Sequence, residues 1–159
     1  MNSKPYWHYR DHLPEILGSG VIRPATLHVQ AGVRPAVWFS LREPYEPTAF
    51  PALYERGSRR MITTIDELFS ASSCGEIGRL RVDPVVLTHD WYGYAKTSGV
   101  SSGGIRRLER SAMEKGGNIF DWRISYEPVP RERWVRVETF NGTNWEGVKG
   151  ITMDMPRME

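Results

Sequence analysis

The segment of residues 5–24 constrains the fold more than any other part of the chain. Its sequence, PYWHYRDHLPEILGSGVIRP, predicts a short aromatic strand, one or two helical turns and a second extended piece. Asp11 is the expected N-cap of the helix, and Gly18 or Gly20 can adopt the positive φ that ends it. Three apolar residues lie three and four apart and so share one helical face: Leu13, Ile16 and Leu17. Such a unit holds His8 at a fixed place in the first strand.

The composition fits one compact domain with an aromatic interior. The chain has 159 residues, of which six are Trp and seven are Tyr, and this predicts a thick aromatic core or a stacking pocket. The formal net charge is only +2, so no broad basic stripe for nucleic acid is expected. Seventeen of the basic residues are Arg and four are Lys. Because the guanidinium fork grips phosphate and carboxylate, this bias favours ligands that carry phosphate.

Cysteine and histidine usage argues against a metal site. The single cysteine, Cys74, excludes an intrachain disulfide and a thiolate cluster, and it is expected to be a buried structural residue. The histidines lack the spacing of metal ligands. The N-terminus has no signal-peptide pattern, and no apolar run approaches 18 residues. A cytoplasmic protein without a membrane partner is therefore expected.

The rest of the chain predicts an α+β fold of many short strands with about three helices. Residues 36–41 are apolar on both faces and predict a central strand, which runs into a stiff loop with three prolines over 42–51. Residues 98–104, rich in Ser and Gly, predict a mobile loop. Further helices are expected within 61–73 (capped by Thr64), 89–96 and 105–115, and further strands over 77–82, 120–126, 134–140 and 143–148, the last two joined by a tight Asn141-Gly142 turn.

Glu138 lies in the predicted strand over 134–140, where alternation puts it on the same face as Arg136. One interpretation is a surface ion pair, which contributes little to stability. The other is a functional carboxylate close to the end of a strand. Three further carboxylates are candidates for the same role, although the loop positions also suit solvated charges: Glu43, Glu46 and Glu146.

The opening segment resembles the ADP-ribosyltransferase fold of the diphtheria-toxin and poly(ADP-ribose) polymerase type. His8-Tyr9-Arg10 is similar to the His-x-Thr strand of that family, and LPEILGSGVI to its helix Leu-x-x-Ile-Leu-x-x-Gly-Ile/Leu. The nearest likeness is to the bacterial branch that includes DNA-targeting toxins. Arg10 departs from the family, which has Thr or Ser there. The resemblance implies a single domain over residues 1–159, with two short, mostly antiparallel sheets around a cleft.

The resemblance also implies a site for NAD as substrate, with no metal. The family's histidine binds the adenosine ribose, which here would be His8, with Tyr9 beside it. The strand that ends in Ser40 would line the nicotinamide pocket, where Trp38 or Phe39 can stack the ring. Arg10 or Arg23 can hold the pyrophosphate. Glu138 would be the catalytic carboxylate, because cleavage of the glycosidic bond builds positive charge on the ribose.

Three functions follow, and the sequence leaves them open. The preferred one is a mono-ADP-ribosyltransferase or NAD glycohydrolase of toxin or phage type, acting on a protein or nucleic-acid acceptor. The alternative is a non-enzymatic interaction or inhibitor domain that uses the same cleft. A small RNA-binding module is the third, against which the near-neutral charge argues. The oligomeric state is not indicated.

Overall fold

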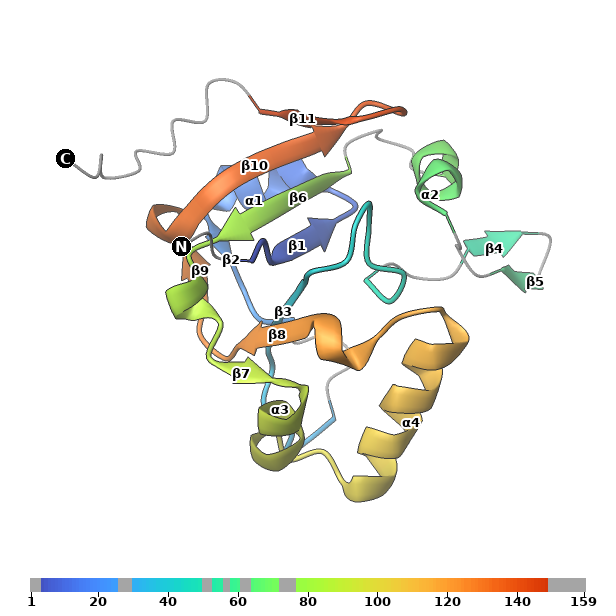
Figure 1. Ribbon diagram of the computed structural model, residues 1–159, viewed down its shortest axis with the longest axis vertical. Helices are drawn as coiled ribbons and strands as arrows, with labels where there is room; N and C mark the ends of the chain where they lie inside the picture. The colour runs from blue at the N-terminus through green and yellow to red at the C-terminus, as the bar shows by residue number, and fades with distance from the viewer. Residues whose placement is uncertain are drawn as a thin grey trace.

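A computed structural model describes residues 4–25, 30–49, 53–55, 58–60, 64–71 and 77–148. It confirms the α+β class: seven antiparallel strands form the main sheet, in the order β11-β10-β6-β1-β3-β8-β7 (Figure 1). These strands are β1 (Trp7–Arg10), β3 (Val37–Ser40), β6 (Gly78–Val82), β7 (His89–Asp90), β8 (Trp122–Ser125), β10 (Trp134–Phe140) and β11 (Trp145–Gly147).

The remaining described elements are two two-stranded sheets and four α-helices. The two sheets pair β2 (Val21–Ile22) with β9 (Val129–Pro130) and β4 (Leu53–Glu55) with β5 (Ser58–Arg60). The helices are α1 (Leu13–Ser19), α2 (Ile65–Ala71), α3 (Trp91–Thr97) and α4 (Ser102–Glu114). Three 3-10 turns complete the described chain: η1 (Pro84–Val86), η2 (Ile119–Asp121) and η3 (Arg131–Arg133).

The main sheet consists of two parts that meet at one residue pair. The four-strand part contains β11, β10, β6 and β1, and the three-strand part contains β3, β8 and β7. Trp7 of β1 and Ser40 of β3 form the only pair of the ladder between them. Figure 1 shows the four-strand part above and the three-strand part below, with the loop after β3 rising between them. The two expected sheets are thus joined into one, with a weak junction.

Helix α1 follows the predicted pattern at its C-terminal end and departs from it at its N-terminal end. Gly20 has φ 73°, and its N–H donates to the Ile16 carbonyl at 2.9 Å, which is the expected glycine exit. The N-cap is His12 with no side-chain cap bond, so the expectation for Asp11 is wrong. The helix lies close to β6, since a Cβ at Gly78 would meet the Leu13 side chain at 2.6 Å.

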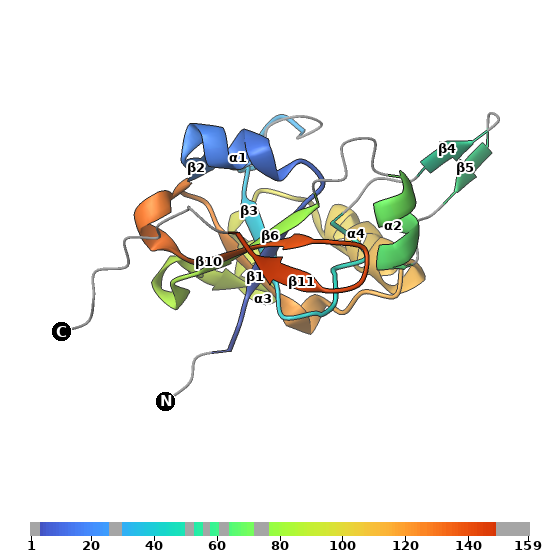
Figure 2. The same ribbon diagram turned by 90° about the horizontal axis from the view of Figure 1, so that it is seen from above.

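Three apolar clusters cover the two faces of the sheet. The first lies under α1 and includes Leu13, Phe39 and Leu80. The second packs α2 against β1, β10 and β11, and the third packs α3 and α4 against β3 and β8. Alternation along β3 sends Phe39 to the first cluster and Trp38 to the third. Figure 2 shows α1 on one side of the strands and α3 toward the other.

One local prediction is confirmed here and two are corrected. Thr64 caps α2, because its Oγ1 accepts from the Glu67 N–H at 3.1 Å. The predicted mobile loop over 98–104 is wrong in part: α4 begins at Ser102, and Ser98 is fully buried. The tight Asn141-Gly142 turn is also wrong, because Phe140 pairs with Trp145 and the hairpin between β10 and β11 has a four-residue loop. His28 and Cys74 lie outside the described residues.

Candidate functional site

A cavity of about 510 Å³ lies where β1 and β3 separate beyond their single pair. It is bordered by β1, β3, the loop over 41–49, α3, α4 and the start of β8. The volume is within the range of small-molecule sites. All six residues predicted to bind a dinucleotide line this cavity: His8, Tyr9, Arg10, Trp38, Phe39 and Ser40.

His8 presents a neutral imidazole to the cavity wall. Its Nδ1 lies 2.8 Å from the Trp38 carbonyl oxygen, which can only accept, so Nδ1 carries the proton. Burial lowers the pKa of His8 from 6.5 to about 4; the Trp38 hydrogen bond opposes this fall, and the charge of Arg10 adds to it. Nε2 is buried and without a hydrogen-bond partner, and it is the acceptor that a ligand hydroxyl can use.

Aromatic rings form most of the cavity wall beside β3. Four of the chain's six tryptophans line it. The rings pack on one another with neighbouring centroids 4.6–6.2 Å apart, mostly edge to face or tilted. The members of this ring cluster are Trp38, Trp91, Tyr94 and Trp122. Such a wall suits a planar ring as ligand.

Glu46 places a buried carboxylate at the edge of the ring cluster. Its Oε1 accepts from Ser40 Oγ at 2.8 Å and from Trp122 Nε1 at 3.0 Å. Its Oε2 accepts from the Thr48 N–H at 3.0 Å and from Thr48 Oγ1 at 2.6 Å. The residue is only 5% exposed, and within the described chain no cationic side chain forms an ion pair with it. Its charge is therefore stabilised by four neutral donors.

Basic side chains line the cavity at its more open parts. Arg10 and Lys115 are both half-buried and both border the cavity. Among the described residues, Arg10 forms one long ion pair, 3.5 Å, with Glu15, and its Nε has no hydrogen-bond partner. Arg23, the second residue predicted to hold a pyrophosphate, is exposed and does not line the cavity. An anionic group at the cavity would meet Arg10 or Lys115.

Glu138, the predicted catalytic residue, is not among the residues that line the cavity. It is buried against two arginines: Oε1 accepts from Arg79 Nε at 2.7 Å, and Oε2 accepts from Arg136 Nε at 2.5 Å. Burial alone would raise the pKa of Glu138, but the hydrogen bonds from Arg136 and Arg79 outweigh it and the pKa is lowered. Its carboxylate is thus already compensated in charge.

Strand register places His8 and Glu138 on opposite faces of the sheet. His8 pairs with Leu80, which pairs with Val137, whereas Tyr9 pairs with Arg79, which pairs with Glu138. Cross-strand neighbours share a face of the sheet, so His8 and Glu138 lie on opposite faces. His8 lines the cavity and Glu138 does not, contrary to the prediction that both residues line one cleft.

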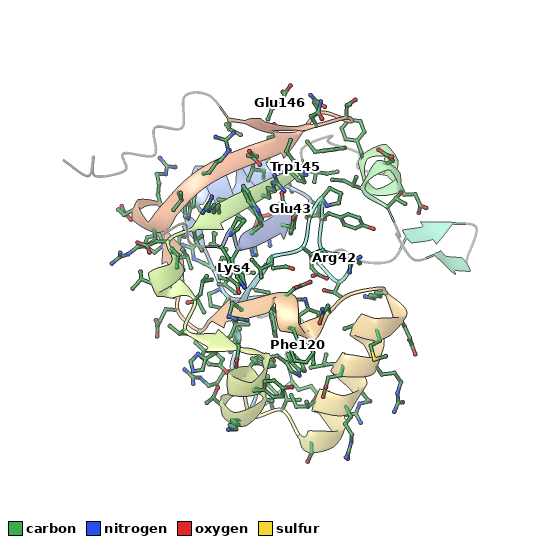
Figure 3. All side chains as sticks on the ribbon, viewed as in Figure 1. Lys4, Arg42, Glu43, Phe120, Trp145 and Glu146 are labelled. Carbon is green, nitrogen blue, oxygen red and sulfur yellow. The ribbon has the colours of Figure 1, made fainter. Side chains whose placement is uncertain are left out.

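The loop after β3 is attached to the four-strand part by three successive residues. Tyr9 Oη donates to the Arg42 carbonyl, Arg79 Nη1 donates to Glu43 Oε1 at 2.8 Å, and Trp145 Nε1 donates to the Pro44 carbonyl at 2.9 Å. Figure 3 shows Glu43 close to Trp145, and Arg42 nearer to the three-strand part. These bonds fix the loop whose next residues carry Glu46 into the cavity.

The other two candidate carboxylates lie outside the cavity. Glu43 is half-exposed and bound to Arg79. Glu146 is exposed on β11, where it accepts from Asn141 Nδ2 at 2.7 Å, and Figure 3 places it at the outer side of the four-strand part. Of the four carboxylates that the sequence singled out, Glu46 alone lines the cavity.

Several lining residues were missed by sequence reasoning. They come from α3, α4 and β8, and the most prominent are Trp91, Tyr94, Ser111, Lys115 and Trp122. A signal was present in α4, because Leu108, Ser111, Ala112 and Lys115 recur at three- and four-residue spacing. Of the apolar members, Ala112 is also buried in the third apolar cluster, whereas Leu108 is 42% exposed.

Two further observations concern metal and membrane. Within the described ranges, no three His, Cys, Asp or Glu side chains come together as a metal-binding group. In the same part of the chain, no helix has the length and apolar character needed to cross a bilayer.

Comparison with family models, with curated proteins and with solved structures finds no match to this chain. The residues of the cavity are therefore the basis for a proposed function.

Proposed function

We propose that the cavity binds NAD and that the chain is a mono-ADP-ribosyltransferase or an NAD glycohydrolase. The observation that carries the proposal is the gathering of the six predicted binding residues around one cavity that also contains a ring cluster. His8 Nε2 offers an acceptor for a ribose hydroxyl, and Arg10 or Lys115 offers a cation for the pyrophosphate.

The proposed reaction breaks the bond between the nicotinamide nitrogen and ribose C1′. Both bonding electrons leave with neutral nicotinamide, and positive charge builds on the ribose until a nucleophile, water or an acceptor group, attacks C1′ and gives up a proton. A fixed carboxylate near that charge lowers the barrier. Glu46 is the carboxylate that the cavity offers, so we propose it for this role in place of Glu138.

A second candidate is a dinucleotide-binding domain without catalysis. It is favoured by the position of Glu138 outside the cavity and by the four hydrogen bonds that already occupy Glu46. Binding is common to both candidates, and only bond cleavage separates them.

The test combines thermal unfolding with chromatographic assay of nicotinamide. NAD at excess should raise the melting temperature, because a ligand of the native state stabilises it by mass action. His8→Gln and Trp91→Leu should reduce that shift, whereas Arg136→Gln, at a residue that does not line the cavity, should not. Release of nicotinamide supports the enzyme, and a shift without release supports the binding domain. Absence of any shift would overturn the proposal.

A further inference from the structure

We propose that the three-strand part of the sheet carries a second ligand site, outside the cavity, at which Arg34 binds a phosphate group, free or as a small monoester. This Tyr126 site consists of one tyrosine ring and the side chains around it: Arg34, Thr88, His89, Thr97 and Tyr126. None of these residues lines the cavity, so the inference is independent of the proposed function. Figure 1 shows that the elements that carry most of them, β7, α3 and β8, meet at the edge of the sheet.

The guanidinium of Arg34 is stacked on a ring and lacks an acceptor of its own. Its Cζ lies 3.7 Å from the Tyr126 ring centroid, and its side-chain N–H groups meet no acceptor within the described residues. Three other arginines there contact rings, and each donates to an internal carboxylate or carbonyl: Arg79, Arg123 and Arg131. The donors of the exposed Arg34 are therefore open to an external oxyanion.

The backbone of Arg34 is also fixed. Its N–H donates to the Ser98 carbonyl at 2.8 Å, and Ser98 is fully buried at the end of α3. The adjoining turn packs tightly against the same segment, since a Cβ at Gly99 would collide with the Gly32 carbonyl oxygen. A guanidinium that starts from a fixed backbone and lies on a ring loses little conformational entropy when it binds an anion.

Hydrogen bonds set the orientation of the Tyr126 ring. Thr97 Oγ1 donates its one proton to the Gly93 carbonyl at 2.7 Å, so it accepts from Tyr126 Oη, which also lies 2.7 Å away. Tyr94 stacks on the Tyr126 ring with the two centroids 6.4 Å apart. The ring is thus held at its hydroxyl and by a second ring, and it forms a fixed platform for Arg34.

His89 and Thr88 bring further polar groups to the same ring. The His89 ring packs edge to face against Tyr126, with centroids 5.0 Å apart. Its Nδ1 lies 2.8 Å from Thr88 Oγ1, whereas its Nε2 is not buried and has no hydrogen-bond partner among the described residues. Donors from Arg34, Thr88 and a charged His89 come from different directions, which suits a tetrahedral phosphate better than a planar carboxylate.

The two carboxylates that adjoin these residues in sequence do not pair with Arg34. Asp90 is the N-cap of α3, and its Oδ1 accepts from the Gly93 N–H at 2.8 Å. Glu127 forms no ion pair within the described part of the chain. The charge of Arg34 is therefore available to an anion from solution.

The experiment titrates inorganic phosphate, and in a second arm glycerol phosphate, into the isotopically labelled protein at an ionic strength held constant with chloride. Two-dimensional NMR follows the backbone amide signals. The signals of Arg34, His89, Thr97 and Tyr126 should shift together and saturate, and acetate should bind more weakly than phosphate. Saturation with phosphate alone would assign the site to the free ion, and saturation in both arms to the phosphate group of either source. Absence of a saturating shift in both arms would overturn the inference.

Two arginine variants separate a built site from general surface charge. Arg34→Gln should weaken phosphate binding at least about tenfold, because it removes the charged bidentate donors. Arg106→Gln removes an equally exposed charge on α4 and should leave the affinity within about twofold of wild type. Equal losses in the two variants would contradict the proposal.

A variant of the platform tests the role of the ring. Tyr126→Leu keeps Arg34 and removes the face on which it lies, so phosphate affinity should fall about threefold. Thermal unfolding checks that each variant folds, and the two arginine variants still decide the proposal if Tyr126→Leu does not fold. Wild-type affinity in folded Tyr126→Leu would contradict the role of the platform.

A further variant distinguishes this site from the cavity, where Arg10 and Lys115 are also available to phosphate. Arg10→Gln should leave the shift of the Arg34 signal unchanged. If Arg10→Gln abolishes phosphate binding and Arg34→Gln does not, the anion binds in the cavity and this inference is wrong. If NAD raises the melting temperature while phosphate leaves the Arg34 signal in place, the proposed function stands and the second site falls; the reverse result retains the site and removes the function.

Discussion

The two buried carboxylates of this chain lie in opposite electrostatic environments. Glu138, in the four-strand part, is paired with Arg79 and Arg136 and lines no part of the cavity. Glu46, at the edge of the three-strand part, has only neutral donors and borders the cavity. A carboxylate that is paired with cationic side chains attracts a cationic ligand weakly, whereas one with only neutral donors attracts it more strongly. The comparison predicts a structural role for Glu138 and makes Glu46 the carboxylate that a ligand in the proposed site would meet.

The largest effect on stability is expected from Glu138→Gln. Loss of the charge leaves the Arg79 guanidinium buried with Glu43 as its remaining carboxylate, and breaking a buried pair in this way costs about 3 kcal/mol or more. Urea unfolding measures the loss. The matched variant Arg136→Gln removes a partner that is 52% exposed and should cost under about 1 kcal/mol. Equal losses in both variants would break the distinction between buried and exposed partners.

Acid should destabilise the protein through His8 before it affects Glu138. The unfolded chain protonates His8 below pH 6.5, but the folded chain does not until about pH 4, so stability is complete above pH 6.5 and falls between these values. The total loss is about 3 kcal/mol. The lowered pKa of Glu138 contributes only below its ordinary value of 4.5. Thermal unfolding from pH 7 to 4 should therefore be flatter in His8→Gln, and an unchanged slope would contradict the buried neutral imidazole.

Glu46→Gln should cost less stability than Glu138→Gln. The amide keeps one acceptor, but its NH₂ then faces either Ser40 and Trp122 or the two donors of Thr48. One unsatisfied pair of buried groups costs about 1–3 kcal/mol. Urea unfolding of the two variants side by side gives their order. The reverse order would mean that Glu46 contributes more to the fold than to the cavity.

The smallest effect is expected where the loop after β3 meets β11. Trp145→Phe keeps the ring over Arg79 and removes the hydrogen bond to the Pro44 carbonyl, at a cost of about 1 kcal/mol. Because the loop positions Glu46, affinity for NAD should fall along with stability. Calorimetry on the folded variant measures the affinity. An unchanged affinity would show that Tyr9 and Arg79 fix the loop without Trp145.

Local patterns in the sequence predicted much of the fold. The apolar spacing of α1 and the glycine exit at Gly20 follow from interactions within a few residues. The alternation predicted over 134–140 is wrong at Trp134, because an irregularity between Trp134 and Arg136 puts Trp134 with Val137 in the first apolar cluster. The predicted Asp11 cap was wrong because His12 is the N-cap of α1. The predicted mobile loop was wrong in part because Ser101 is the N-cap of α4. Boundaries of this kind depend on tertiary packing as much as on propensity.

The candidate site was predicted only in part, and for a physical reason. The residues predicted to bind the dinucleotide lie within two short strands, so a single pair, Trp7 with Ser40, is enough to bring them together. The face of Glu138 depends on the register of β10 against β6, which contains an irregularity between Trp134 and Arg136. A shift by one residue moves a side chain to the other face, and the sequence does not fix that register. Glu46 was a candidate, but its burial depends on bonds from β1, β6 and β11 to the preceding loop residues.

The most direct test of the account is calorimetric titration of NAD⁺ into three proteins at a temperature where all are folded: wild type, Glu46→Gln and Glu138→Gln. Each variant replaces one buried carboxylate by the corresponding amide, so the two variants differ only in where the carboxylate is removed. The account predicts that Glu138→Gln binds within about twofold of wild type and that Glu46→Gln binds at least about tenfold more weakly. Loss of binding in Glu138→Gln, with wild-type affinity in Glu46→Gln, would contradict it.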